Sequence, residues 1–431
     1  MKIFEKYGMS KTIQFFVGVL AIVLFVVLGA ALFPEAAKSS LMFRMFIGLA
    51  IGYALSRAAM GFAGTVNRAY TTGSTKLMKA IATAFIFGGI ATFVVVIGGV
   101  ITADKLPGNT LNWGLLIGAT LFGFGMSFGV CCASGVLTDM ADSPLRALVV
   151  LIFFCMGGFL GKALVHQEWM AWYKAPIFGI EALGNKANLN FATWFGWDGT
   201  NGALGALILT ILLCSGVMYL STLYENKRKR ENTYLGCECE KCIAKIQAEP
   251  KEEETLAYRI IAKPWKMTTG AVVIALAFAA LLVVTKGGWG VSGPLGQWFA
   301  RILVAFGASK EGLMNMTGYG ASVFDTPFFN NAMYVQDFSI FFGAIVYLLM
   351  SGNFWKPKEW LFKPLEIVFF AFGGILLGLA INLAGGCNAG GLYTPISSFA
   401  TSGWVYLICI VAGGFLGNIV RKYLYKACKL S

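Results

Sequence analysis

The chain has 431 residues, of which 57% are hydrophobic and only 13% are charged, whereas soluble domains carry about 25% charged residues. This composition excludes a water-soluble globular protein. The formal net charge of +13 would suit a nucleic-acid partner, but the basic residues stand at the ends of apolar runs, where they indicate membrane topology instead.

Apolar runs recur along the chain at about the 20-residue length that a helix needs to cross the hydrocarbon core of a bilayer. We therefore predict an all-α polytopic protein with about ten transmembrane helices. The first run is too long for a signal-peptide core and is expected to be retained. A further helix is expected at Trp298–Phe306, either against the bilayer or partway into it. The ten runs are Lys11–Phe33, Leu41–Ala59, Met78–Thr102, Leu111–Phe128, Leu145–Val165, Gly202–Tyr224, Met267–Thr285, Phe338–Met350, Leu365–Leu383 and Trp404–Tyr423.

Lysine and arginine clusters between these runs predict the orientation, because cytoplasmic loops are enriched in both residues. Placing every cluster inside puts both termini in the cytoplasm and leaves the segments Val165–Thr200 and Lys286–Gln336 outside. The clusters are Lys2, Lys6 and Lys11; Arg57, Arg68, Lys76 and Lys79; Lys227, Arg228, Lys229 and Arg230; Lys356, Lys358 and Lys363; and Arg421, Lys422 and Lys426.

One long polar stretch, Glu225–Pro264, is rich in lysine and glutamate. It is too short to form an independent core, so we interpret it as a cytoplasmic linker. The predicted organisation is a membrane half over residues 1–224, a linker over 225–264 and a second membrane half over 265–431.

The two halves share a repeated motif. Gly123–Gly135 contains Cys132, Gly378–Gly390 contains Cys387, and in both a glycine precedes the cysteine by nine positions and another follows it by three. The sequence Gly-Gly-Phe-Leu-Gly then recurs at Gly157 and at Gly413. We predict a duplication, with chance agreement in a glycine-rich chain as the alternative. The charge pattern predicts that the Cys132 loop enters the membrane from the cytoplasmic side and the Cys387 loop from the outer side. The halves are therefore predicted to be inverted repeats whose interrupted helices meet near the bilayer midplane.

Cys132 and Cys387 are the main candidate site residues, with Gly135 and Gly390 beside them. Interrupted helices in a membrane must be buried in protein or line a wet cavity, and a helix N-terminus at the break offers amides to an anion. A thiol adds a weak, polarizable donor suited to sulfur. The alternative is a buried cysteine that packs as a small apolar side chain.

Polar neighbours extend this candidate site. Asn382 and Asn388 bracket Cys387 and carry amide donors for an oxyanion. Arg57 and Arg68 flank another break, where they either attract an anion to the inner mouth or serve only as positive-inside anchors.

The cysteine motifs resemble those of the YeeE/YedE sulfur-transport family of bacterial membrane proteins. The resemblance covers roughly Met45–Leu164 and Gly287–Tyr423, with support from Gly287–Pro294 and Arg57–Gly73. It implies residence in the bacterial inner membrane and uptake of thiosulfate through an hourglass-shaped path, in which cysteines at the constrictions contact the substrate by weak S–H hydrogen bonds. Two of those cysteines match Cys132 and Cys387.

One family position differs in this chain. The family has a third cysteine whose place here falls most naturally at Gly61, and the sequence has no cysteine from Met1 to Val130. Cys131, beside Cys132, is a partial replacement. Because members of the family are also linked to selenium metabolism, a selenium species is an alternative substrate.

The linker carries Cys237, Cys239 and Cys242 within six residues. Thiols in a reducing cytoplasm bind soft metals or accept sulfane sulfur, but a structural zinc site uses four ligands and no histidine or fourth cysteine is near. These three residues are therefore weak metal candidates, and an ordinary solvated linker is the alternative.

A transporter without a cofactor is the function that the sequence favours. A membrane sulfur or redox relay enzyme is the alternative from another class, and a scaffold for a cytoplasmic protein is a third. The chain lacks a haem-type histidine pair and a nucleotide-binding glycine loop, and with His166 as its only histidine it offers few groups for acid–base catalysis. The predicted partners are a small sulfur or selenium anion, the bilayer and a cytoplasmic sulfur-accepting protein, but no nucleic acid.

Overall fold

The computed structural model describes residues 11–177, 189–248, 256, 258–354 and 362–428. Within these residues, ten helices are long and apolar enough to cross a membrane, which confirms the predicted all-α polytopic class. They comprise α2 (Lys11–Leu32), α3 (Lys38–Arg57), α5 (Lys76–Ile97), α6 with α7 (Trp113–Gly129 and Ala133–Asp142), α8 (Pro144–His166), α9 (Ala203–Arg230), α11 (Met267–Thr285), α15 (Ala332–Met350), α16 (Pro364–Ala384) with the elements that follow it, and α18 (Thr401–Ala427). The topology signals Lys2, Lys6, Lys356 and Lys358 fall outside the described residues.

The observed helix bounds follow the apolar runs closely, and α11 coincides with its prediction. The largest difference at a helix start is in α15, which begins six residues before the predicted run. The Asn331 side chain caps it by accepting hydrogen bonds from the Met333 and Tyr334 amides at 3.0 and 3.3 Å, as N-cap residues do. The added turns contain Gln336 and Asp337, which lower the hydropathy although both are fully buried.

Two membrane spans are interrupted, as the cysteine motifs predict. The first break separates α6 from α7, and the second follows α16, where a π-helix, η8 (Asn388–Tyr393), continues into α17 (Thr394–Ser397). Short helices also follow α3 and α11, namely α4 (Gly64–Thr72) and α12 (Gly293–Ala305). The helix α12 contains most of the predicted segment Trp298–Phe306.

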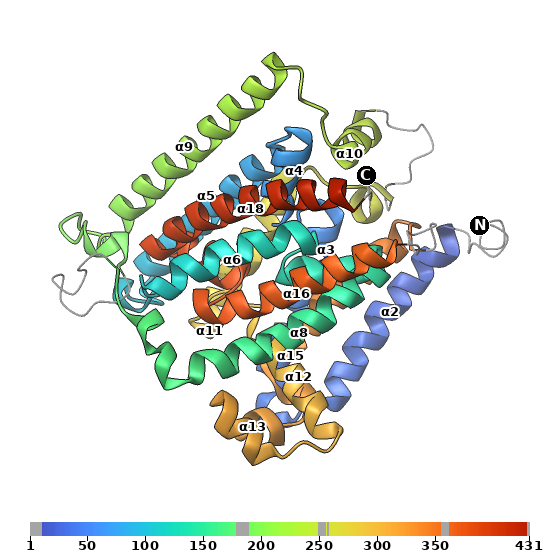
Figure 1. The fold of residues 1–431 in the computed structure, drawn as a ribbon, viewed down its shortest axis with the longest axis vertical. Helices are drawn as coiled ribbons and strands as arrows, with labels where there is room; N and C mark the ends of the chain where they lie inside the picture. Colours follow the sequence, from blue (N-terminus) through green and yellow to red (C-terminus); the bar gives the residue numbers. More distant parts are fainter. Residues whose placement is uncertain (1–10, 178–188, 249–255, 257, 355–361, 429–431) are drawn as a thin grey trace.

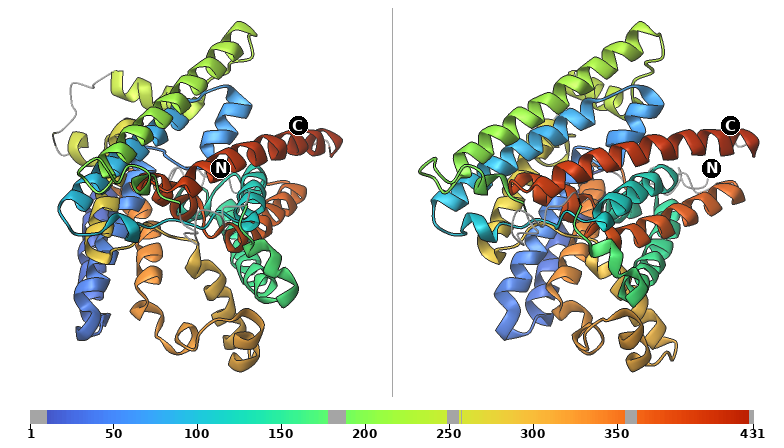
Figure 2. Two further views of the ribbon diagram at one scale, coloured as in Figure 1. Left: turned by 90° about the vertical axis from the view of Figure 1, so that its left-hand side faces the viewer. Right: turned by 60° about the vertical axis from the view of Figure 1, so that its left-hand side comes forward.

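Helices of the first half pack mainly on helices of the second half. The pair α3 and α15 corresponds to the pair α11 and α5, and the pair α8 and α16 corresponds to the pair α18 and α6. Figures 1 and 2 show the two sets interleaved around a centre where α6 lies beside α16. If each helix is replaced by its counterpart in the other half, the contact between α3 and α15 becomes the contact between α11 and α5. This symmetry of contacts is consistent with the predicted repeat.

Glycines allow this close packing. A Cβ atom at Gly157 of α8 would collide with the backbone of Ile375 on α16, and one at Gly413 of α18 would collide with the backbone of Thr120 on α6. The two Gly-Gly-Phe-Leu-Gly sequences therefore have the same task in the two halves, which is to bring helix backbones together inside the membrane.

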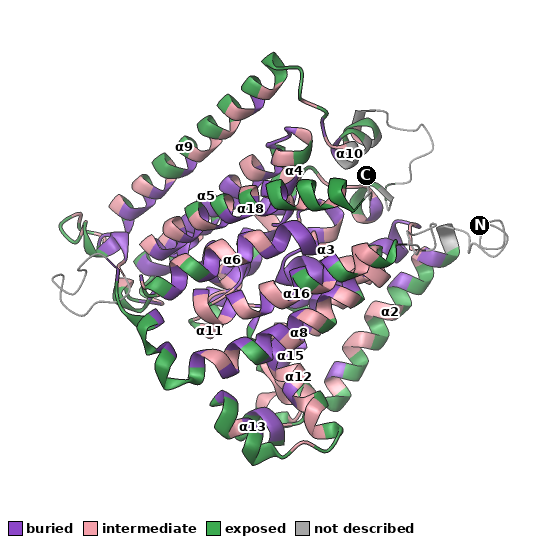
Figure 3. Cartoon of the chain, viewed as in Figure 1, coloured by how far each residue is buried: buried purple, intermediate pink, exposed green. Residues whose placement is uncertain are grey.

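The surface of the molecule fits a lipid environment. Helices α2 and α9 lie at opposite edges of the molecule (Figure 1), and both are largely exposed (Figure 3). Leu20, Leu24, Leu212 and Leu220 on these helices are each more than 50% exposed. Such apolar surface is stable only against lipid or another apolar surface. The protein is thus a multi-pass membrane protein.

The polar linker folds back onto the membrane part. Its helix α10 (Glu238–Ala248) is attached to the connection between α4 and α5, where the amides of Leu235 and Gly236 donate to the Thr72 carbonyl at 2.9 and 3.1 Å. The Ser74 hydroxyl donates to Glu240 at 2.6 Å. The linker is therefore docked along its described length rather than hanging free.

Candidate functional site

The first break is built by a left-handed residue followed by an extended cysteine. Val130 ends α6 with φ 58°, and Cys132 is extended (φ −121°, ψ −176°) as the N-cap of α7. The Cys132 thiol takes the capping role, since it accepts a hydrogen bond from the Gly135 amide at 3.3 Å and lies 3.5 Å from the Ser134 hydroxyl. It is 0% exposed. The thiol is therefore held at a helix N-terminus, where amide groups favour negative charge.

The second break has the same construction. Gly385 ends α16 with φ 72°, and Cys387 is extended (φ −93°, ψ −169°) as the N-cap of η8. In each break the left-handed residue precedes the cysteine by two positions. Cys387 is 1% exposed, and π-helical turns such as η8 are frequent at functional sites.

The fold brings the two breaks together. The thiols of Cys132 and Cys387 lie close enough to interact electrostatically with each other and with the Tyr406 hydroxyl. The Asn388 amide donates to the Met126 sulfur at 3.3 Å, which links the second break to the helix that precedes the first. The two predicted cysteines therefore lie together in the buried centre of the molecule, where the two halves meet.

Two other predicted residues, Cys131 and Arg57, have charged or polar neighbours. Cys131 is buried near the ion pair between Asp139 and Arg146, whose side chains are 2.9 Å apart. Arg57 is the last residue of α3 and so stands at the predicted break before α4, but its side chain contacts the linker. Its Nε donates to the Lys263 carbonyl at 2.8 Å and its guanidinium lies 4.3 Å from the centre of the Trp265 ring, which makes Arg57 an anchor for the linker.

The predicted glycines differ in the space around them. A Cβ at Gly135 would stand 3.2 Å from the Cys132 sulfur, whereas one at Gly390 would meet its nearest atom, the Trp289 carbonyl oxygen, at 3.7 Å. A Cβ at Gly61 would meet no atom within 4 Å. Gly135 is therefore needed by the thiol beside it, while Gly61 has room for a side chain.

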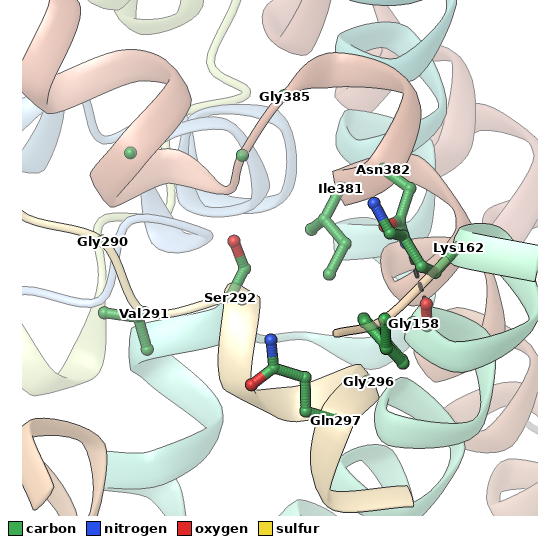
Figure 4. A pocket seen from close by; sticks show the side chains of 14 residues that line it. Gly158, Lys162, Gly290, Val291, Ser292, Gly296, Gln297, Ile381, Asn382 and Gly385 are labelled. Carbon is green, nitrogen blue, oxygen red and sulfur yellow. Dashed lines mark hydrogen bonds between the residues drawn. The ribbon is translucent and has the colours of Figure 1, made fainter. Parts of the chain in front are cut away.

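A pocket of about 330 Å³ reaches the second break. Gly385, Gly386 and Gly390, which surround Cys387, form one of its walls. Figure 4 shows Ser292 and Gln297 of the α12 segment pointing into it, and Lys162 of α8 standing at its side. The two thiols are not among its lining residues, so the glycine backbone around Cys387, and not its thiol, forms this wall of the pocket.

Three of these pocket residues were not predicted from the sequence. Lys162 offers a positive charge, while Ser292 and Gln297 offer polar side chains. A signal for Lys162 was present, because a lysine interrupts the apolar run Leu145–Val165 three positions before its end and charged residues inside membrane segments are rarely incidental. Ser292 lies in the Gly287–Pro294 motif, which carried no chemical assignment.

Asn382 and Tyr319 also line the pocket. The Asn382 amide donates to the Gly158 and Gly378 carbonyls at 2.9 and 3.2 Å, so its donors are used within the protein. Burial raises the pKa of Tyr319, with Tyr334 and Cys155 nearby adding to the shift. Its phenol therefore stays protonated at neutral pH.

The linker cysteines give no metal site among the side chains that the structure describes. No group of three or more His, Cys, Asp or Glu residues that could hold a metal occurs there. The side chains of Cys239 and Cys242 lie outside that part of the chain, and only Cys237 is described, half-buried at the start of α10. The weak metal prediction for the three cysteines therefore stays a prediction.

Comparison with known proteins supplies an independent result. The sequence profile of a family described as "Sulphur transport" matches residues 57–416. A protein named thiosulfate transporter TsuA from Spirochaeta thermophila is 22% identical over 322 residues, which cover 74% of this chain and 79% of that protein. The thiosulfate transporter TsuA of Escherichia coli is 19% identical over 372 residues, which cover 86% and 91% of the two chains.

Proposed function

Since the chain belongs to the sulphur transport family, which matches residues 57–416, we propose that it carries thiosulfate across the bacterial inner membrane by a path past Cys132 and Cys387. Sulfur transport follows from the family. The choice of thiosulfate rests on the names of the two relatives. The observation that carries the path is the meeting of two matched helix breaks, each capped by a buried thiol, at one point.

The pocket beside Cys387 is the proposed entrance. Lys162 raises the local concentration of anions, and Ser292 and Gln297 are hydrogen-bonding groups for sulfonate oxygens. Further entry requires the loop before Cys387 to move aside. Gly385 and Gly386, with φ 72° and 154°, make such movement easy because glycine crosses between backbone conformations with little steric penalty.

Transfer past the two thiols then uses weak donors in succession. An S–H group donates only weakly, so an anion held by Cys387 and then by Cys132 is bound without being trapped, as conduction requires. The anion leaves past Cys131 toward Arg68 and Arg146. In the proposed orientation both termini and the linker face the cytoplasm, where a sulfur-accepting protein consumes the product.

The closeness of the two thiols also favours a second function, in which they relay sulfane sulfur as a membrane enzyme. A selenium anion remains the alternative substrate for transport. The two functions differ in one respect: a transporter matters only while its substrate is outside the cell, whereas a relay acts on sulfur that is already bound or inside.

Uptake measurements decide between them. Cells that lack their own thiosulfate importers should accumulate radiolabelled thiosulfate when they express this chain, and unlabelled selenite in excess should reveal whether a selenium anion competes. Growth on thiosulfate as the sole sulfur source should be restored as well. Absence of uptake from cells with normal amounts of the protein in the membrane would refute transport.

A further inference from the structure

Among the buried carboxylates of the described residues, Asp337 differs in having no hydrogen-bond partner on either oxygen. It lies in the second turn of α15 and is 0% exposed. Other buried acids there have close partners: Glu225 has Lys229 at 2.7 Å, and Glu240 has Ser74 at 2.6 Å. An ionisable group inside a membrane protein is costly and is retained for a function.

The charged side chain that interacts electrostatically with Asp337 is that of Arg44 on α3. Arg44 donates to the Gln336 side-chain oxygen at 2.7 Å, and the Gln336 amide donates to the Gly290 carbonyl at 3.1 Å. Gly290 lines the pocket. A chain of hydrogen bonds therefore connects the positive partner of Asp337 to the wall of the proposed entrance.

Polar groups also lead from the pocket toward the carboxylate itself. Tyr319 lines the pocket and lies near Cys155 of α8, and Cys155 in turn lies near Asp337. A phenol and a thiol can both pass a proton along, because each is a donor and an acceptor. The carboxylate is thus buried from solvent, and two groups able to exchange protons lie near it in succession, Cys155 and then Tyr319 at the pocket.

The remaining elements around α15 add little charge near Asp337. Arg301 of α12 lies over the Tyr334 ring, one turn before Asp337. Helix α7, which carries Asp139 and Asp142, meets α15 around Ala344–Leu348, about 10–16 Å further along at 1.5 Å per residue. Tyr53 and Arg57 of α3 lie near Tyr347 at that same end, and α2 carries no titratable residue from Thr12 to Leu32. Arg44 therefore dominates the electrostatic surroundings of Asp337.

From this arrangement we infer that Asp337 is a proton-binding site that couples proton entry to anion entry, an inference that rests on the proposed function. A proton from the pocket side forms an O–H bond with one carboxylate oxygen, and that bond breaks when the proton is released on the other side. No electrons move. While Asp337 is neutral, the charge of Arg44 is uncompensated and favours an anion in the pocket, so proton and anion bind together.

The test uses the purified full-length protein in liposomes, with the membrane potential clamped and labelled thiosulfate outside. With one proton per anion, wild-type protein should accumulate thiosulfate about tenfold for each unit by which the outside is more acidic, since one pH unit corresponds to a factor of ten in an equilibrium. Asp337→Asn should show no such accumulation but should still exchange labelled for unlabelled thiosulfate at a rate within about threefold of wild type. Asp337→Glu should retain accumulation.

Asp325→Asn is the matched control, because Asp325 is exposed and paired with Lys310; it should behave as wild type. The coupling role would be overturned if Asp337→Asn still accumulated thiosulfate. It would also be overturned if this variant, at normal abundance, lost both exchange and accumulation. If that variant does not fold, a pH-sensitive dye inside wild-type liposomes decides, and thiosulfate entry without internal acidification overturns the inference. Wild-type protein that exchanges no thiosulfate refutes the proposed function itself, and the inference with it.

Discussion

Val130 and Gly385 occupy the same backbone position in the two breaks with very different steric consequences. Both are left-handed, with φ 58° and 72°. Glycine adopts this conformation freely, whereas a β-branched residue there is an outlier that costs about 1–3 kcal/mol. The packing around Val130 must offset that cost, so the break before Cys132 is the more rigid of the two and the loop before Cys387 is the one suited to move.

At the residue scale the two thiols are the first test. Cys132→Ala and Cys387→Ala should each reduce thiosulfate uptake about tenfold or more, the effect of losing ~1.4 kcal/mol of interaction with the passing anion. Serine should rescue uptake only in part, because it is a donor of similar size but is less polarizable. Initial uptake rates at matched membrane abundance provide the measurement. Normal transport by both alanine variants would make these cysteines packing residues.

Gly61 provides a second test at this scale. A Cβ at this position meets no atom within 4 Å, so Gly61→Cys should leave the melting temperature unchanged and should shift selectivity toward thiosulfate if the side chain faces the path. Gly391→Cys is the contrasting variant, because a Cβ there would stand 2.6 Å from the Tyr406 ring, and it should lower the melting temperature. Competition between thiosulfate and selenite measures the selectivity.

How far the site could be predicted depends on what each residue contacts. Cys132 and Cys387 could be proposed as a matched pair because their repeated spacing can be read directly from the sequence. For Arg57 the sequence left two roles open, attraction of an anion or a simple anchor, and it could not show the contact with the linker, because that segment lies about 200 positions away. Lys162 and Asp337 lay within or beside apolar runs, where hydropathy averages hide a single charged residue. Their surroundings come from α12 and α3, which sequence spacing does not place.

The helices themselves were predictable because the bilayer sets their length. Helix α11 matches its apolar run from end to end, and α15 alone starts much earlier, because its polar first turns are covered by protein rather than lipid. Which helices pair was not predictable. Pairing depends on glycine faces whose partners, such as Gly378 and Gly158, are separated by half the chain.

At the element scale, the crossing of α8 and α16 gives a direct prediction. Gly378→Ala places a methyl group against the backbone of Phe154 and Gly158, so it should lower stability by about 1–3 kcal/mol. Gly216→Ala is the control, because Gly216 is exposed on α9 and its Cβ meets no atom within 4 Å. That change should be neutral or stabilising, since alanine favours helix by about 1 kcal/mol. Thermal unfolding in detergent compares the two, and equal melting temperatures would contradict the close crossing.

At the scale of the whole molecule, orientation is the property to test. Glu311 in α13 (Lys310–Thr317) and Glu231 after α9 are both exposed. An impermeant thiol reagent should label Glu311→Cys in intact cells, but should label Glu231→Cys and the exposed native Cys428 only after permeabilisation. The charge pattern predicts that Glu311 and Glu231 lie on opposite sides of the membrane. The opposite labelling pattern would invert the topology and, with it, the direction of the proposed path.

The interleaving of the two halves also constrains how a cell can make this protein. Helices α3, α5, α6 and α8 are synthesised first, but each packs mainly on a helix of the second half. When the ribosome has completed α8, the glycine-lined face that will receive α16 is still open to lipid, and the partner of α6 arrives only with α18. The nascent chain must therefore wait in the membrane, inserted but unassembled, until its last transmembrane helix emerges. Assembly is accordingly a late, post-insertion event, and a truncation before α18 removes a partner from the centre of the molecule rather than trimming its edge.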